Sequence, residues 1–191
     1  MISSVGREVE TGWGARCMLG APAFLVRDVM TSGDSSLAFE FVDLVEGAGN
    51  SLGVRASLRV PGNSIGNAYR PAGSLERISV NGADFLRFGA VGAFGSALFD
   101  LNSGHIVEWI HDSSEVGLVN TSIDAFSECV KAFVEKFPLE DVEDEGERDE
   151  RDNMLAREIE GDVRRIDPEA YFEGGFWYEI RWSVAIGDFS D

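Results

Sequence analysis

Two runs of sequence decide the fold class, "LRFGAVGAFGSALFDLNSGHIVEWI" at residues 86–110 and "GLVNTSIDAFSECVKAFVEKF" at residues 117–137. Residues 100–104 combine Asp, Asn and Ser, whose side chains can bond their own backbone, with a glycine that can take a positive φ. We therefore predict a turn here and a β-hairpin around it. Beyond the turn, apolar residues occur at alternate positions on both faces of residues 105–110, which indicates a strand that is covered on both sides.

The second run has the period of a helix. Its apolar residues recur at steps of three and four and so share one side of a helix: Ile123, Phe126, Val130, Phe133, Val134 and Phe137. Thr121 or Ser122 can cap the start of this helix, and Pro138 prevents its continuation. A hairpin followed by such a helix predicts an α+β fold.

Five short segments of the chain occur in an order that is informative about its family. "VNTSIDAF" at residues 119–126 follows the predicted hairpin, "LGAPAFL" lies at 19–25 and "LRFGAVG" at 86–92. "DPEAY" at 167–171 is followed by "FWYEI" at 176–180. Together these segments resemble the SUKH superfamily (Smi/Knr-like) of bacterial toxin-immunity proteins, specifically its fourth family.

The resemblance implies a fold and a function. The implied fold is one SUKH-like α+β domain over residues 1–191, with a mixed or antiparallel sheet packed by helices. The implied function is to neutralise a cognate polymorphic toxin, such as a nuclease or nucleic-acid deaminase, by stoichiometric binding that blocks its active site. No catalysis is implied, and no cofactor.

The charge of the chain narrows the choice of partner. Sixteen basic residues stand against 34 acidic ones, for a formal net charge of −18. Direct nucleic-acid binding is disfavoured, because phosphate contacts rely on Lys and Arg. A basic toxin would be attracted and would associate faster. The same acidity also serves solubility, so composition alone does not choose between these explanations.

The N-terminus, the apolar runs and the cysteines indicate a cytoplasmic protein. Four charged residues interrupt the first 17 residues, where a signal peptide needs a continuous apolar core. The longest uncharged stretch, residues 88–99, is shorter than the roughly 20 apolar residues that span a bilayer. The two cysteines are Cys17 and Cys129, and the position of Cys129 beside the apolar side of the predicted helix favours a buried, reduced thiol.

The strongest shift in composition follows Pro138. Nine acidic residues form the candidate partner-binding set: Glu140, Asp141, Glu143, Asp144, Glu145, Glu147, Asp149, Glu150 and Asp152. Such a block is typical of a solvated linker, here at about 138–152, and the alternative is that it contacts a basic toxin. Its second half can join a helix, because Leu155, Ile159, Val163 and Ile166 make an apolar stripe.

Further elements are predicted on either side of these runs. Residues 37–45 and 54–60 have strand patterns, and residues 66–73 are expected to form a loop. Residues 176–186 leave two alternatives open. Their alternating aromatic and β-branched residues favour a strand, whereas the family resemblance implies a helix.

No catalytic or metal site stands out. On a strand, His105 and His111 would be roughly 20 Å apart, too far to share a metal ion. Asp100 and Asn102 lack the further ligands of a calcium loop, and the glycines at residues 89–95 lack the spacing of a nucleotide-binding loop. Two rival classes stay open: a regulatory scaffold of the same fold, and a small hydrolase in which one of the histidines meets a Ser and an Asp.

Overall fold

The computed structural model describes residues 38–47, 55–111, 113, 115–137 and 142–189 of the chain. A five-stranded antiparallel sheet is its main element, and its strands follow one another in both sequence and space. They are β3 (Tyr69–Val80), β4 (Ala83–Val91), β5 (Gly95–Asp100), β6 (Ile106–Ile110) and β7 (Val116–Asn120). This architecture confirms the predicted α+β fold with an antiparallel sheet packed by helices.

The predicted hairpin lies between β5 and β6. The carboxyl oxygen Oδ1 of Asp100 accepts a hydrogen bond from the backbone N–H of Asn102 at 2.8 Å, and Gly104 has a φ of +75°. The side chain and the glycine thus reverse the chain as the local sequence predicts. At the preceding turn, between β4 and β5, Gly92 also has a positive φ, of +54°.

The prediction of a loop over residues 66–73 was wrong from Tyr69 onward, where β3 begins. The register of β3 against β4 shifts between Pro71 and Glu76, and this irregularity breaks the alternation by which a strand is recognised. A usable signal was nevertheless present. Asn81 and Gly82 join β3 to β4 with φ of 52° and 82°, and Asn-Gly is the preferred pair for such a two-residue turn.

A second, two-stranded antiparallel sheet is formed by β1 (Phe41–Val45) and β2 (Ser57–Pro61). Both predicted strands are confirmed, although each begins three or more residues later than expected. The guanidinium of Arg59 lies 4.4 Å from the ring centroid of Phe41 and stands opposite Asp43 in the register. The side chain of Arg59 is therefore engaged within this sheet.

The helix α1 (Ile123–Val134) matches its prediction closely. Ser122 is its N-cap, and its hydroxyl accepts a hydrogen bond from the backbone N–H of Ala125 at 3.1 Å. Cys129 on this helix is 1% exposed, and burial raises the pKa of its thiol to about 12. The expectation of a buried structural thiol at Cys129 is thereby confirmed, whereas Cys17 lies outside the described residues.

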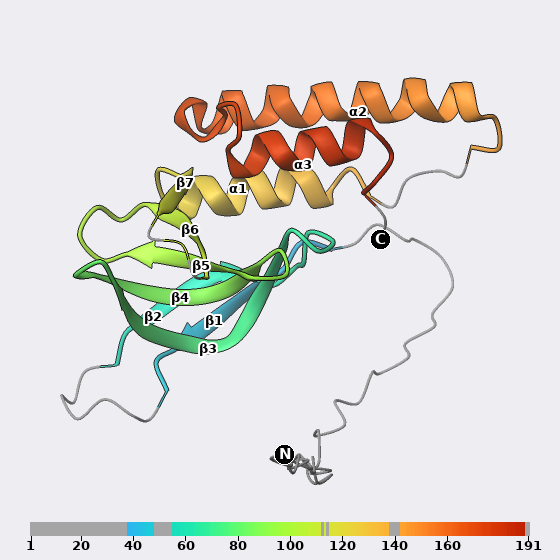
Figure 1. Ribbon diagram of the computed structural model, residues 1–191. Helices are drawn as coiled ribbons and strands as arrows, with labels where there is room; N and C mark the ends of the chain where they lie inside the picture. The colour runs from blue at the N-terminus through green and yellow to red at the C-terminus, as the bar shows by residue number, and fades with distance from the viewer. Residues whose placement is uncertain (1–37, 48–54, 112, 114, 138–141, 190–191) are drawn as a thin grey trace, which may run out of the picture. The chain divides into compact units, whose positions relative to one another are not determined.

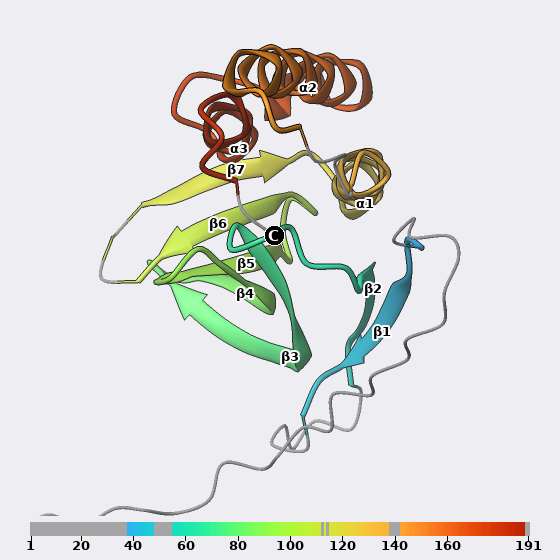
Figure 2. The same ribbon diagram turned by 90° about the vertical axis from the view of Figure 1, so that its right-hand side faces the viewer.

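Three helices cover one face of the five-stranded sheet, as Figures 1 and 2 show. α1 and α3 (Phe176–Ala185) contact β7, and α2 (Glu145–Ile166) lies outside them and contacts both. A short 3-10 helix, Pro168–Ala170, links α2 to α3. Within the described residues, no helix is both long and apolar enough to cross a membrane.

The prediction of an acidic linker was wrong from Glu145 onward, whereas the alternative that its second half joins a helix is confirmed. That residue begins α2. Asp144 is the N-cap of this helix, and its carboxyl oxygen accepts a hydrogen bond from the backbone N–H of Glu147 at 3.0 Å. Acidic side chains are favourable at a helix N-terminus because they face its partial positive charge. The apolar stripe farther along α2 is buried, so packing stabilises the whole helix.

Residues 176–185 form the helix that the family resemblance implied, so the strand reading from their alternation was wrong. Phe176, Ile180 and Val184, four residues apart, are buried together. Trp182 and Ile186 would have shared their face in a strand but are 49% and 56% exposed. The packing of α3 under α2 selects the four-residue period over the two-residue one.

Candidate partner-binding surface

The nine predicted acidic residues fall into four groups. Glu140 and Asp141 lie outside the described residues, Asp144 caps α2, and Asp152 is 6% exposed. The remaining five are exposed just before α2 and in its first turns, and we call them the acidic surface of α2: Glu143, Glu145, Glu147, Asp149 and Glu150. Within the described part of the chain, no ion pair engages any of these five.

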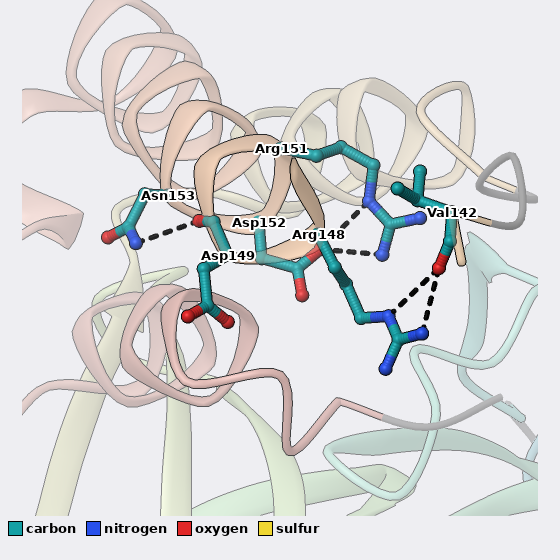
Figure 3. Close-up of polar contacts among 6 residues, drawn as sticks. All are labelled: Val142, Arg148, Asp149, Arg151, Asp152 and Asn153. Carbon is teal, nitrogen blue, oxygen red and sulfur yellow. Dashed lines mark hydrogen bonds and ion pairs between the residues drawn. The ribbon is translucent and has the colours of Figure 1, made fainter. Parts of the chain in front are cut away.

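The two arginines among these residues are turned to internal partners (Figure 3). Nε and Nη2 of Arg148 donate hydrogen bonds to the backbone oxygen of Val142 at 3.2 and 2.8 Å. Nε and Nη2 of Arg151 donate to Oδ1 of Asp152 at 3.0 and 2.8 Å. Because both cations are held in this way, they do not neutralise the acidic surface by direct pairing.

Asp152 has a structural position rather than an accessible one. Besides its pairing with Arg151, its Oδ2 lies 3.4 Å from the point where a Cβ at Gly187 would stand. Gly187 follows α3 and has a φ of +69°. Asp152 therefore faces the chain reversal at the end of α3, and we place it outside the acidic surface.

His111 does not form a hydrolytic site with its neighbours among the described residues. Nε2 of His111 lies 2.9 Å from the hydroxyl oxygen of Ser96, but Ser96 is only 1% exposed, so a substrate cannot reach that oxygen. No ion pair joins His111 to a carboxyl group among these residues, and none of their His, Cys, Asp or Glu side chains form a group that could hold a metal ion.

Three of the segments that suggested the family meet in one buried network. The side-chain amide of Asn120 donates from Nδ2 to Oδ2 of Asp167 at 2.9 Å, and its Oδ1 accepts from the indole N–H of Trp177 at 2.9 Å. The backbone N–H of Thr121 donates to the same Oδ2 at 2.7 Å. Asn120 and Trp177 are 0% exposed. These motif residues therefore join β7, the end of α2 and α3, and are not accessible to a partner.

Comparison with known proteins identifies one family. A family model described as SUKH-4 immunity protein matches residues 64–183. The match takes in "LRFGAVG", "VNTSIDAF", "DPEAY" and "FWYEI", whereas "LGAPAFL" at 19–25 lies before it. No curated protein and no solved structure shows a significant match. The match confirms the resemblance that the sequence suggested.

Proposed function

The chain belongs to the SUKH-4 immunity protein family, and from this premise we propose that it neutralises a cognate toxin by direct, stoichiometric binding. Family membership implies a toxin as the partner. Our proposal adds that the toxin is basic, such as a nuclease or nucleic-acid deaminase, and that the bound chain covers its active site. Enzymes that act on nucleic acids bind phosphates through Lys and Arg, so their active sites attract an acidic protein.

The observation that carries the proposal is the acidic surface of α2. Its five carboxylates are exposed, and the neighbouring arginines are held by Val142 and Asp152. The acidic surface is part of a chain whose formal net charge is −18. Opposite charge on the two partners speeds their encounter and penalises association with other acidic proteins.

The helical frame of the acidic surface also supports its use in binding. Asp144 caps the helix, and Arg148 ties the first turns to the backbone at residue 142. A linker would lose conformational freedom on binding, whereas a preformed helix has already lost most of it. Carboxylates on α2 can therefore contact a partner at a smaller entropic cost than the sequence alone suggests.

The toxin partner is tested by co-expression. We expect the chain to restore growth to cells that produce the toxin encoded beside it, and to co-purify with that toxin at a fixed ratio. Growth arrest in cells that contain ample folded chain would contradict the proposal.

The role of the acidic surface is tested by the rate of association. One variant replaces all five of its residues with Gln or Asn, and a matched control replaces five exposed glutamates elsewhere: Glu115, Glu128, Glu135, Glu169 and Glu173. Both variants change the net charge equally. We expect the α2 variant to lower the association rate constant by roughly tenfold at low salt, and the difference to shrink as salt screens the charges. Equal association rate constants for the variant and the control would show that the acidic surface is not part of the interface.

A further inference from the structure

A cavity of about 320 Å³ lies between the helix-facing side of the sheet and α3. Phe176, Ile180 and Phe189 form an apolar wall of the cavity. Three carboxyl groups also line it, those of Glu108, Glu179 and Asp188. The carboxyl groups come from β6, α3 and the segment after α3. None of these three residues belongs to the acidic set that the sequence predicted. They are up to 80 positions apart in the sequence, so no local pattern marks them as a group.

Small residues on the neighbouring strands make room for Glu108. Glu108 pairs with Ala97 on β5 and with Gly117 on β7. A Cβ at Gly117 would stand only 3.2 Å from Oε1 of Glu108. The carboxyl group thus occupies the space above a glycine, on the side of the sheet where Ile106 and Ala97 contribute to the main core.

The end of α3 closes the cavity from the other side. Gly187 has a φ of +69° and donates its N–H to the oxygen of Val184 at 3.1 Å, and Asp188 donates to that of Ser183 at 2.9 Å. This is the hydrogen-bond pattern of a Schellman C-cap. It turns the chain so that Phe189 packs against the ring of Phe133, with 5.2 Å between centroids. Asp188 and Phe189 are therefore held at the cavity by a defined backbone geometry.

The cavity carries negative charge without a cation of its own. In the described parts of the chain, no ion pair engages Glu108, Glu179 or Asp188. Burial, and the nearby charge of Glu179, raise the pKa of Glu108 above its usual range. Both effects make the ionised carboxylate unfavourable, and a cation in the cavity would relieve them.

We infer that this cavity receives an arginine side chain of the toxin. The aliphatic part of arginine suits the apolar wall formed by Phe176 and Ile180, and the guanidinium suits the carboxylates of Glu108 and Glu179. Its planar fork can bind two carboxyl groups at once, which a lysine ammonium does less well. The volume is at the lower end for small-ligand sites, which suits one side chain, and the carboxylates repel anionic nucleotides and phosphates.

The inference rests on the proposed function for its partner, so its first test uses the chain alone. N-acetyl-arginine methylamide is titrated into the labelled protein, and N-acetyl-norleucine methylamide serves as the uncharged probe. We expect the arginine amide to shift the amide resonances of Gly92, Ile180 and Ser183, with an affinity on the order of 1 mM for so small a ligand. No shift, or equal shifts with the norleucine amide, would overturn the inference.

Variants connect the binding to the carboxylates. E108Q/E179Q should abolish the shifts, while the control E128Q/E169Q, with the same charge change at exposed positions, should retain them. If the double variant fails to fold, E179Q alone gives the same test from the exposed side of α3. Retention of binding in the folded cavity variant would overturn the inference.

The toxin supplies the second test. In the complex, E108Q/E179Q should raise the dissociation rate constant by roughly tenfold or more, because it removes the partners of a desolvated charge. An unchanged dissociation rate would overturn the inference. Failure to form any complex would instead contradict the proposed function, and the amide titration separates these two failures because it needs no toxin.

Discussion

The side chain of Asn120 holds together three elements that are distant in sequence, and its replacement by alanine should destabilise the protein severely. Its amide bonds Asp167 at the end of α2 and Trp177 in α3, each at 2.9 Å. Asn120 and Trp177 are 0% exposed and Asp167 is 3% exposed. Water therefore cannot replace the lost partners without a local opening of the structure.

The expected cost follows from the groups that the substitution leaves behind. N120A leaves the indole N–H of Trp177 without its acceptor, and an unsatisfied buried donor costs about 1–3 kcal/mol. Asp167 keeps the bond from the N–H of Thr121, at 2.7 Å, but loses the one from the amide. Together with the space that the amide vacates, we expect a loss of about 3–5 kcal/mol in the free energy of unfolding. This is a large part of the roughly 5–15 kcal/mol typical of whole domains.

The measurement is urea unfolding followed by far-UV circular dichroism. N153A is the matched control, because Asn153 also donates a hydrogen bond from Nδ2, in its case to the backbone oxygen of Asp149 at 2.9 Å on the exposed surface of α2. Its cost should stay within about 0.5 kcal/mol. A double-mutant cycle with W177F isolates the buried bond, because phenylalanine removes the donor that N120A orphans.

The result that refutes this reasoning is equally specific. If N120A costs less than about 1 kcal/mol, the network does not hold the helices to the sheet as its geometry indicates. If the free-energy costs of N120A and W177F are additive, the hydrogen bond between the indole and the amide contributes nothing to stability, whatever its length. We expect instead that N120A costs about 1–3 kcal/mol less in the W177F background.

Three further predictions concern single positions. G89A should lower the free energy of unfolding in urea by about 2–3 kcal/mol, because the new Cβ would stand 2.7 Å from a backbone oxygen of β3. G73A should be nearly neutral, because a Cβ there would meet no atom within 4 Å. Equal costs for the two variants would contradict the close approach at Gly89. S122A should lower the free energy of unfolding by about 1 kcal/mol, because α1 loses its N-cap. An unchanged unfolding midpoint would show that the cap does not stabilise α1. E108Q should stabilise the protein at pH 7 but not at about pH 4: the raised pKa means that Glu108 supports folding when protonated, and that this contribution is lost as pH rises through the folded-state pKa. A gain independent of pH would show that burial and Glu179 do not govern the charge of Glu108.

Local signals predicted much of the fold correctly. The turn at Asp100 and Gly104, the period of α1 and the Ser122 cap all depend on side chains that contact their own backbone or share one helix face. Interactions over a few residues leave the same trace in the sequence as in the structure. The acidity of the segment after Pro138 was likewise readable, and the apolar stripe from Leu155 to Ile166 indicated that its second half can join a helix. The start of that helix at Glu145 was not readable, because the residues that stabilise α2 by packing lie farther along it.

Other elements depended on contacts that no local pattern records. Residues 176–185 satisfy a strand period and a helix period, and the burial of Ile180 and Val184 beneath α2 selects the helix. β3 is irregular between Pro71 and Glu76, so its strand character comes from pairing with β4. The family resemblance was more informative than periodicity at α3, because it reflects the packing of the whole domain.

By itself, the sequence determined the α+β class, the hairpin, α1 and the family, since each of these follows from short-range hydrogen bonding, periodicity or motif order. Only the tertiary structure decided what the acidic and motif residues do. It made most of the acidic run the beginning of a helix, with five carboxylates exposed on and just before it, and it brought Asn120, Asp167 and Trp177 into one buried network. It also brought Glu108, Glu179 and Asp188 to one cavity. The physical reason is that burial and electrostatic environment are properties of residues far apart in sequence, which only the packed chain brings together.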